Sequence, residues 1–331
     1  MTAVLRSVAM IGDGGWGTAL AMLLAEEGHA VRLWGHDPAY LEELDRTRQN
    51  RKFLPGFSIP REVAFEPDLD RALLESDLAI VAVPSNFLRA TLERARGAVG
   101  VPVLSVAKGM EEGSLARPSA VIAEVWGARG VAVLSGPSHA EEVAGKLPCT
   151  VVLAAEDAAR AEALRDVLIS PRFRVYSSTD VAGVELGGAL KNVIAVAVGI
   201  CEGLGLGDNA RAALMTRGLA EMTRLGTALG GRPETFAGLS GMGDLITTCV
   251  SPYGRNRAVG LALAQGRSLE AVLAATEQVA EGVHTCGPVC ALARAKGVEM
   301  PISEALLGVL HGALTPREAV GALMTRAPRA E

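Results

Sequence analysis

Val8-Ala9-Met10-Ile11-Gly12-Asp13-Gly14-Gly15-Trp16-Gly17-Thr18-Ala19 is the stretch that decides the fold of this chain. An apolar run of strand length meets a G-x-G-x-x-G motif and passes directly into a helical pattern, which is the context that the dinucleotide-binding fingerprint requires. Gly12 permits the tight turn, Gly14 lets the backbone approach a pyrophosphate, and Gly17 lets the helix pack closely on the strand. The helix N-terminus offers unpaired N–H groups to the anion. The alternative is a glycine-rich turn without a ligand.

Length and composition place the rest of the chain around this motif. The chain has 331 residues, of which 49% are hydrophobic and 21% charged, so we expect a globular protein of two domains. Its net charge of −5 gives no general attraction to nucleic acid or membrane. The apolar opening has no signal-peptide cleavage site, and the longest apolar run, Val193–Cys201, is too short to span a membrane. A cytoplasmic protein is expected.

Cysteine and lysine usage add two expectations. Five cysteines with no CxxC pair predict neither disulfides nor a metal site, and they fit a reducing cytoplasm. Of 32 basic residues only five are lysines, so a lysine in apolar surroundings calls for a specific reason. These lysines are Lys52, Lys108, Lys146, Lys191 and Lys296.

The first half of the chain alternates short apolar runs with helical segments. This alternation predicts βαβ units and a doubly wound parallel sheet, with ligands beyond the carboxyl ends of its strands. Asp37-Pro38 is typical of a helix N-cap followed by proline. The expected strands are Val8–Ile11, Ala30–Trp34, Leu78–Val83, Val101–Ala107, Val131–Leu134, Thr150–Ala154 and Phe173–Tyr176, and the expected helices are Leu20–Glu27, Pro38–Arg48, Leu69–Glu75, Phe87–Arg96 and Ala116–Trp126.

The strand pattern disappears after about residue 180. We therefore expect a Rossmann-type domain over residues 1–180 and an all-α domain over residues 181–331. A long helical stretch, Val181 to Arg224, opens the second half, and Thr315-Pro316-Arg317-Glu318 is a capping box that starts the last helix. Further helices are expected at Ala258–Ala264, Leu269–Ala275, Gly287–Lys296 and Ser303–Gly312.

Polar residues follow several of the expected strands on the cofactor side of the sheet. Ser85 could simply start the next helix, whereas Lys108, directly after a buried strand, is harder to explain without a function. Ser138 and Glu141 fit a capping box, which is a structural role, although a capped helix start there would also present N–H groups to a ligand.

Lys191 is the candidate proton carrier. It lies within Glu185-Leu186-Gly187-Gly188-Ala189-Leu190-Lys191-Asn192-Val193-Ile194, where small and aliphatic neighbours imply desolvation. Desolvation lowers a lysine pKa toward the range that suits proton transfer. The alternative is a lysine that extends to solvent at a domain rim.

Two further segments point to an anionic substrate. Asp244 lies in a glycine-lined turn and is either a helix N-cap or a functional carboxylate. Arg255 and Asn256 open a helix, where a cation opposes the helix dipole unless an anion is bound. Arginine, asparagine and free N–H groups together suit a phosphate, and salt bridging to the other domain is the alternative.

Taken together, these residues resemble the bacterial NAD(P)-dependent glycerol-3-phosphate dehydrogenase family. The resemblance covers almost the whole chain, and its ordered set of motifs is specific, although many dehydrogenases share the first one. The motifs are Gly12–Ala19, Phe53-Leu54-Pro55-Gly56, Val83-Pro84-Ser85, Ala107-Lys108-Gly109, Gly136-Pro137-Ser138-His139-Ala140-Glu141, Leu190-Lys191-Asn192, Gly241-Met242-Gly243-Asp244-Leu245, Arg255-Asn256-Arg257 and Val279-Ala280-Glu281-Gly282.

The resemblance implies reversible hydride transfer that reduces dihydroxyacetone phosphate to sn-glycerol 3-phosphate for glycerophospholipid synthesis. It implies that Lys191 donates and accepts the proton, and that Lys108 and Asp244 position and balance charge around it. The implied substrate contacts are Lys108, Gly136, Ser138, Lys191, Asp244, Gly254, Arg255 and Asn256. The implied cofactor contacts are Gly12, Gly14, Gly15, Trp16, Gly17, His36, Lys108, Ala140, Arg255, Val279 and Glu281.

The chain departs from the family pattern at Gly15 and Gly254, where serine is usual; each change loses a hydroxyl and keeps a backbone N–H. Asp37 stands where an NAD-type site places its ribose-binding acid but is expected to cap a helix, and His36 suits a 2′-phosphate. We therefore expect NADP(H), with NAD(H) also used.

Two other functions are compatible with a dinucleotide-binding domain joined to a helical one. A dehydrogenase for 3-hydroxy acids or ketopantoate would also pair such domains, but Arg255-Asn256 suits a phosphate better than a carboxylate. A dinucleotide-binding sensor would leave Lys191 and Arg255 without a role. The Ala-rich helical half could bury a face against a second subunit, which would make the protein a homodimer.

Overall fold

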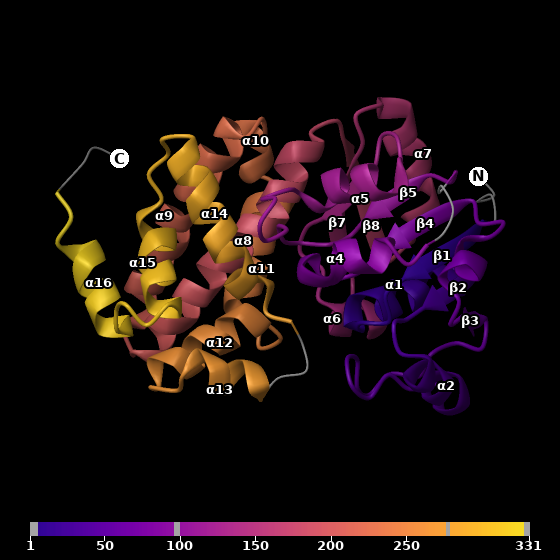
Figure 1. Cartoon of the computed structure of the whole chain (residues 1–331), viewed down its shortest axis with the longest axis horizontal. Helices are drawn as coiled ribbons and strands as arrows, with labels where there is room; N and C mark the ends of the chain where they lie inside the picture. The colour runs from indigo at the N-terminus through magenta and orange to yellow at the C-terminus, as the bar shows by residue number, and fades with distance from the viewer. Residues whose placement is uncertain (1–5, 96–99, 276–278, 328–331) are drawn as a thin grey trace.

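The computed structural model describes residues 6–95, 100–275 and 279–327 and divides into an α/β half and a helical half (Figure 1). Within the described residues, eight strands form one sheet in the order β3-β2-β1-β4-β5-β6-β7-β8. This order reverses direction at β1, where β4 lies on its other side, and creates the crevice in which open α/β sheets bind their ligands. The strands are β1 (Ser7–Ile11), β2 (Ala30–Trp34), β3 (Val63–Phe65), β4 (Leu78–Val81), β5 (Val103–Ser105), β6 (Ala132–Ser135), β7 (Cys149–Ala154) and β8 (Phe173–Ser178).

The expected doubly wound sheet is confirmed, with two differences. The pair β6–β7 is antiparallel, whereas a parallel sheet was expected throughout, because only the short helix α6 separates these strands and it does not carry the chain back across the sheet. The sequence pattern also missed β3, an edge strand of three residues.

Helices cover the sheet of the first half. The Asp37 carboxylate caps α2 by accepting hydrogen bonds from two backbone N–H groups, as predicted. The expected helix Phe87–Arg96 ends at Leu92 in the structure, and Arg96 lies outside the described residues. The helices are α1 (Gly15–Glu26), α2 (Pro38–Thr47), α3 (Leu69–Leu73), α4 (Ser85–Leu92), α5 (Pro118–Trp126), α6 (Ala140–Ala144) and α7 (Ala158–Leu168).

The described part of the second half contains helices and no strands. The predicted stretch Val181 to Arg224 is two helices, because Gly205 and Gly207 adopt positive φ values that break it. The capping box at Thr315 and Glu318 is confirmed. The helices are α8 (Val181–Gly203), α9 (Gly207–Ala228), α10 (Pro233–Phe236), the π-helix η1 (Leu239–Gly243), α11 (Asp244–Val250), α12 (Arg255–Ala264), α13 (Leu269–Ala274), α14 (Glu281–Ala295), α15 (Pro301–Leu310) and α16 (Pro316–Met324).

Helix α8 is the core of the helical half. It is long and apolar enough to cross a membrane, yet 94% of its most apolar window is buried inside the protein. Helices α9, α10, α11, α12, α14 and α15 pack against it, and its N-terminal end lies against the sheet (Figure 1). Its apolar composition is therefore that of a helix buried on every side.

Candidate active site

The glycine loop has the geometry that a dinucleotide pyrophosphate requires. Gly12 leaves β1 with a φ of +119°, and a Cβ there would lie 2.7 Å from the carbonyl oxygen of Ala82. Gly17 packs so closely that its Cβ would lie 2.0 Å from the Gly12 carbonyl oxygen. A Cβ on Gly14, by contrast, would meet nothing within 4 Å, and Gly14 is the N-cap of α1 and provides no side-chain cap. The N–H groups of the first turn of α1 therefore face open space that an anion can enter.

Steric crowding explains why position 15 of this chain is a glycine. A Cβ at this position would lie 2.5 Å from the backbone carbonyl oxygen of Phe53. A serine, as is usual in the family pattern, would therefore force the loop or the Phe53 segment to move. The loop consequently presents only backbone N–H groups at this position.

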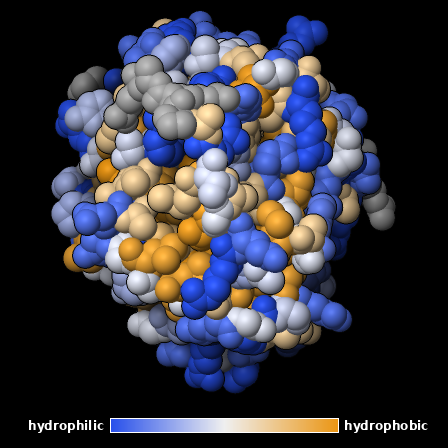
Figure 2. Space-filling model, turned by 90° about the vertical axis from the view of Figure 1, so that its left-hand side faces the viewer, coloured by the Kyte–Doolittle hydropathy of each residue, from blue (hydrophilic) through white to orange (hydrophobic). Residues whose placement is uncertain are grey.

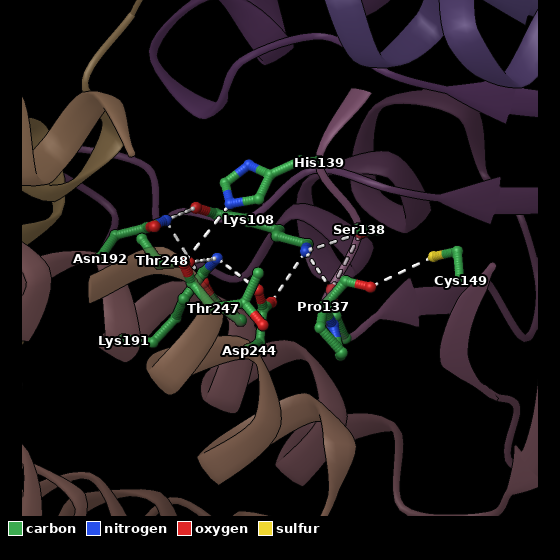
Figure 3. A network of polar contacts seen from close by, with 12 residues as sticks. Lys108, Pro137, Ser138, His139, Cys149, Lys191, Asn192, Asp244, Thr247 and Thr248 are labelled. Atoms are coloured by element: carbon green, nitrogen blue, oxygen red, sulfur yellow. Dashed lines mark hydrogen bonds and ion pairs between the residues drawn. The ribbon is translucent and has the colours of Figure 1, made fainter. Parts of the chain in front are cut away.

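Three charged side chains from distant parts of the sequence meet beside the sheet (Figure 3). Lys191 Nζ lies 2.6 Å from Asp244 Oδ1, and Lys108 Nζ lies 2.8 Å from Asp244 Oδ2. Lys108 comes from the loop after β5, whereas Lys191 lies on α8 and Asp244 begins α11. One carboxylate thus holds two lysines together across the two halves of the molecule.

These three side chains are buried to different degrees. The exposed fraction is 2% for the side chain of Asp244, 7% for Lys191 and 17% for Lys108. Burial, opposed by the attraction of Asp244 and assisted by the nearby charge of Lys108, lowers the pKa of Lys191 to about 8. Burial alone would raise the pKa of Asp244, but the two ammonium groups outweigh it and keep this pKa below its usual range.

The two lysines differ in how many of their hydrogens are used. An ammonium group has three N–H donors. Lys108 donates all three, to the Gly136 carbonyl oxygen at 2.8 Å, to Ser138 Oγ at 3.3 Å and to Asp244. Lys191 donates to Asp244 and, at 2.6 Å, to Thr248 Oγ1, and among the described residues it has no third acceptor. Lys191 therefore keeps one donor for a bound molecule.

A chain of amides connects this cluster to the start of α12. The amide nitrogen of Asn192 donates to the Lys108 carbonyl oxygen at 2.8 Å, and its oxygen accepts from Asn256 at 2.9 Å. The Asn256 oxygen in turn accepts from the backbone N–H of Gly282 at 2.9 Å. The Asn256 side chain therefore joins α8, α12 and α14 by hydrogen bonds.

Arg255 and Arg257 at the start of α12 have different surroundings. Arg257 is paired with Glu202 at 2.6 Å. Arg255 is exposed and, within the part of the chain that the structure describes, has no hydrogen-bond or ion-pair partner, and no side chain caps its helix. Gly254 leaves no room for a side chain, since a Cβ there would lie 2.5 Å from the Thr248 carbonyl oxygen. An unpaired guanidinium at an uncapped helix N-terminus suits an anion.

The remaining predicted residues lie along the crevice between the halves. Glu281 begins α14 and accepts from Ser85 through both the backbone N–H, at 2.9 Å, and Oγ, at 2.6 Å. Ala140 begins α6 next to Gly15, and Trp16 packs against the core at a ring distance of 6.5 Å from Phe173. His36 follows β2 and is exposed, and Val279 is partly buried just before α14.

Two local roles considered from the sequence differ from the structure. Ser138 does not cap α6, because the helix begins one residue later than the capping box requires and has His139 at its N-cap; Ser138 Oγ instead bonds the Gly136 carbonyl oxygen and accepts from Lys108. Asp244 is not an N-cap but the first helical residue of α11, which frees its carboxylate for the lysines. Thr248 and Asn192 were missed, although Thr248 follows Asp244 by one helical turn.

The chain is similar to known proteins over nearly its whole length. Residues 7–161 match the sequence model described as NAD-dependent glycerol-3-phosphate dehydrogenase N-terminus, and residues 180–321 match the one described as its C-terminus. The chain is 46% identical over 332 residues to a Glycerol-3-phosphate dehydrogenase [NAD(P)+] of Geobacillus kaustophilus, covering 99% of this chain and 96% of that protein. It is 49% identical over 323 residues to one of Moorella thermoacetica, covering 97% and 96%.

A solved structure is similar over the same length. The crystal structure of glycerol-3-phosphate dehydrogenase from Coxiella burnetii superimposes with a TM-score of 0.93 at 38% identity. The match covers 97% of this chain and 99% of that one, so both halves and their connection are shared.

Proposed function

The chain belongs to the NAD-dependent glycerol-3-phosphate dehydrogenase family, and on that premise we propose which of its residues carry the reaction. It is an NAD(P)-dependent oxidoreductase that interconverts dihydroxyacetone phosphate and sn-glycerol 3-phosphate. This decides against a dehydrogenase for ketopantoate or 3-hydroxy acids and against a sensor without activity.

Lys191 is the proton donor for reduction and the proton acceptor for oxidation. The observation that carries this assignment is its third N–H, which has no acceptor among the residues that the structure describes, whereas Lys108 donates all three of its hydrogens within the protein. As negative charge develops on the C2 oxygen of dihydroxyacetone phosphate, the Lys191 ammonium donates a proton to it. A pKa of about 8 allows Lys191 to act in both directions near neutral pH.

Asp244 and Lys108 prepare Lys191 for this role. Asp244 holds the Lys191 ammonium in one orientation and offsets part of the cost of its burial. Lys108 neutralises the second carboxylate oxygen and fixes Gly136 and Ser138 at the edge of the substrate site. The preorganised charges stabilise the developing alkoxide without rearranging during the reaction.

The substrate phosphate binds at the start of α12. Arg255 supplies the charged side chain, and the uncapped backbone N–H groups of Arg255 and Asn256 supply further donors. The Asn256 side chain links this end of α12 to Asn192, the residue after Lys191. The phosphate and the reacting carbon are thereby held by connected elements. Positioning of this kind lowers the barrier by fixing the substrate before reaction.

Replacing Arg255 tests the phosphate site. In Arg255→Ala we expect kcat/KM for dihydroxyacetone phosphate to fall about 10- to 150-fold, because a charge-assisted hydrogen bond contributes about 1.5–3 kcal/mol. The loss should appear mainly in KM. Both substrates are compared at saturating dinucleotide, because Arg255 is also a proposed dinucleotide contact. Unphosphorylated dihydroxyacetone serves as the matched control, since its low turnover should then not change in the variant. An equal loss for both substrates would contradict the phosphate assignment.

The dinucleotide binds across the crevice at the switch point of the sheet. Gly12, Gly14, Gly15, Trp16 and Gly17 hold its pyrophosphate end, and the open space at Gly14 fits that group. His36, Ala140, Val279, Glu281, Lys108 and Arg255 complete the proposed contacts. When bound, the nicotinamide supplies the hydride.

We further propose that residues 1–180 form the dinucleotide-binding domain and residues 181–331 the helical substrate-binding and catalytic domain. The change from sheet to helix between β8 and α8 supports this boundary. We infer that the enzyme works in the cytoplasm and that its product supplies glycerophospholipid synthesis. The five buried free thiols agree with a reducing compartment.

We infer that the protein is a homodimer through the end of the helical half. A groove of about 1500 Å³ lies between α8, α9, α15 and α16, lined by apolar residues such as Leu214, Leu219 and Met324, of which Met324 is 80% exposed. Figure 2 shows apolar side chains gathered among polar ones on this face. Light scattering should give about twice the chain mass of 34.3 kDa, and a mass of one chain would contradict the dimer.

A further inference from the structure

Asp13, between the first two glycines of the loop, has a buried carboxylate whose role is unexplained by the reaction. Its exposed fraction is 5%, and its Oδ2 atom is buried and has no hydrogen-bond partner within residues 6–95, 100–275 and 279–327. A carboxylate oxygen buried in this way is costly unless a ligand completes it. The oxygen therefore marks a place where a donor is missing.

The backbone of Asp13 is fixed, so its side chain has a defined direction. The Asp13 carbonyl oxygen accepts from Asn50 Nδ2 at 2.7 Å and from Thr18 Oγ1 at 3.2 Å. Asn50, which is 1% exposed, also donates to Thr18 at 2.8 Å. These bonds tie the loop to α1 and to the segment after α2.

The carboxylate lies at the carboxyl end of β2. A Cβ built on Gly35, the residue that follows β2, would lie 2.5 Å from Asp13 Oδ2 and 2.6 Å from its Cγ. The Asp13 carboxylate thus occupies the space that a side chain at position 35 would otherwise fill. In dinucleotide-binding folds this end of the second strand carries the acid that binds the adenosine ribose.

The acid that follows β2 in the sequence is engaged elsewhere. Asp37 Oδ1 accepts from the backbone N–H groups of Ala39 at 3.0 Å and Tyr40 at 3.3 Å. The charges of His36 and Lys52 attract the Asp13 carboxylate and that of Asp37 repels it. Burial raises the pKa of Asp13 above its ordinary value, which agrees with an oxygen that lacks a donor.

We propose that Asp13 determines the cofactor preference by accepting a hydrogen bond from a ribose hydroxyl of NAD(H) and by repelling the 2′-phosphate of NADP(H). The glycine loop thereby supplies a carboxylate at the end of β2. Gly35 has no side chain there, and the carboxylate of Asp37 caps α2. The proposal reverses the preference that His36 indicated in the sequence. It rests on the dinucleotide-dependent function above.

Calorimetric titration of the full-length enzyme with NADH and NADPH, without substrate and at 0.15 M ionic strength, tests the proposal. The wild type should bind NADH at least about tenfold more tightly than NADPH, because a like charge beside the phosphate opposes binding. Asp13→Asn keeps an acceptor and loses the charge, so its NADPH affinity should rise about tenfold while its NADH affinity stays within about threefold. Asp13→Ala should gain for NADPH and also lose for NADH.

Two controls separate this role from a structural one. Asp37→Asn removes a nearby exposed charge and should leave the ratio of the two dissociation constants within about threefold, because exposed charges are screened. Asp13→Asn should melt no lower than wild type at pH 7, since a raised pKa in the folded state means that the ionised carboxylate destabilises the fold at that pH.

A wild type that prefers NADPH, or an unchanged ratio in both Asp13 variants, would overturn the proposal. Because no substrate is present, these outcomes are independent of turnover. Failure to reduce dihydroxyacetone phosphate would instead count against the assigned reaction and would leave the measured ratio of affinities standing.

Discussion

Raising the pH through about 8 should slow the reduction of dihydroxyacetone phosphate and speed the oxidation of sn-glycerol 3-phosphate. Reduction needs the protonated ammonium of Lys191, which is lost as the pH rises through its pKa. Oxidation needs the neutral amine, which appears over the same range. Above the midpoint, kcat/KM for reduction should fall about tenfold per pH unit, whereas kcat/KM for oxidation should rise about tenfold per pH unit below the midpoint and level off above it. Initial rates in both directions at constant ionic strength measure the two profiles.

Asp244→Asn is the matched variant for these profiles. Burial and the charge of Lys108 lower the pKa of Lys191, whereas Asp244 raises it, so removing the carboxylate charge leaves the lowering influences less opposed. Both midpoints should move to lower pH, and turnover near pH 7 should fall for reduction more than for oxidation. Profiles that rise and fall together, or midpoints that Asp244→Asn leaves in place, would show that another group carries the proton.

The parts of the site that are local in sequence could be predicted. Gly12 to Gly17 are contiguous, and their spacing alone requires a turn, a close approach and a helix start, which the structure contains. The cap of α2 by Asp37 follows from two adjacent residues. Lys191 could be singled out in the sequence because lysine is rare in this chain and its neighbours are aliphatic. Its burial in α8 confirms the expected desolvation.

The parts that depend on tertiary contacts could not be derived from the residues. Nothing in the spacing of Lys108, Lys191 and Asp244 brings two lysines onto one carboxylate, and only the family resemblance grouped them. The number of free donors on each lysine is a property of the assembled site. Arg255 and Arg257 are likewise equivalent in the sequence and differ only because Glu202 pairs with one of them.

The remaining errors have local physical causes. The capping box at Ser138 failed because the required spacing was present but α6 starts one residue later, which leaves Ser138 for Lys108. The direction of β7 is not encoded by an apolar run, which suits either orientation. No role was predicted for Asp13, because its carboxylate reaches the end of β2 only in the folded protein, where Gly35 has no side chain to occupy that space.

The steady-state rate of dihydroxyacetone phosphate reduction by Lys191→Met tests the central claim most directly. Methionine keeps the apolar length of the side chain and removes the donor, so kcat should fall about 10²- to 10⁴-fold. Binding of NADH and NADPH by calorimetry should stay within about threefold of wild type, because the glycine loop is unchanged. A variant that binds the dinucleotide and has lost turnover is the predicted result. Turnover near that of the wild type would contradict the assignment of Lys191 as the proton donor.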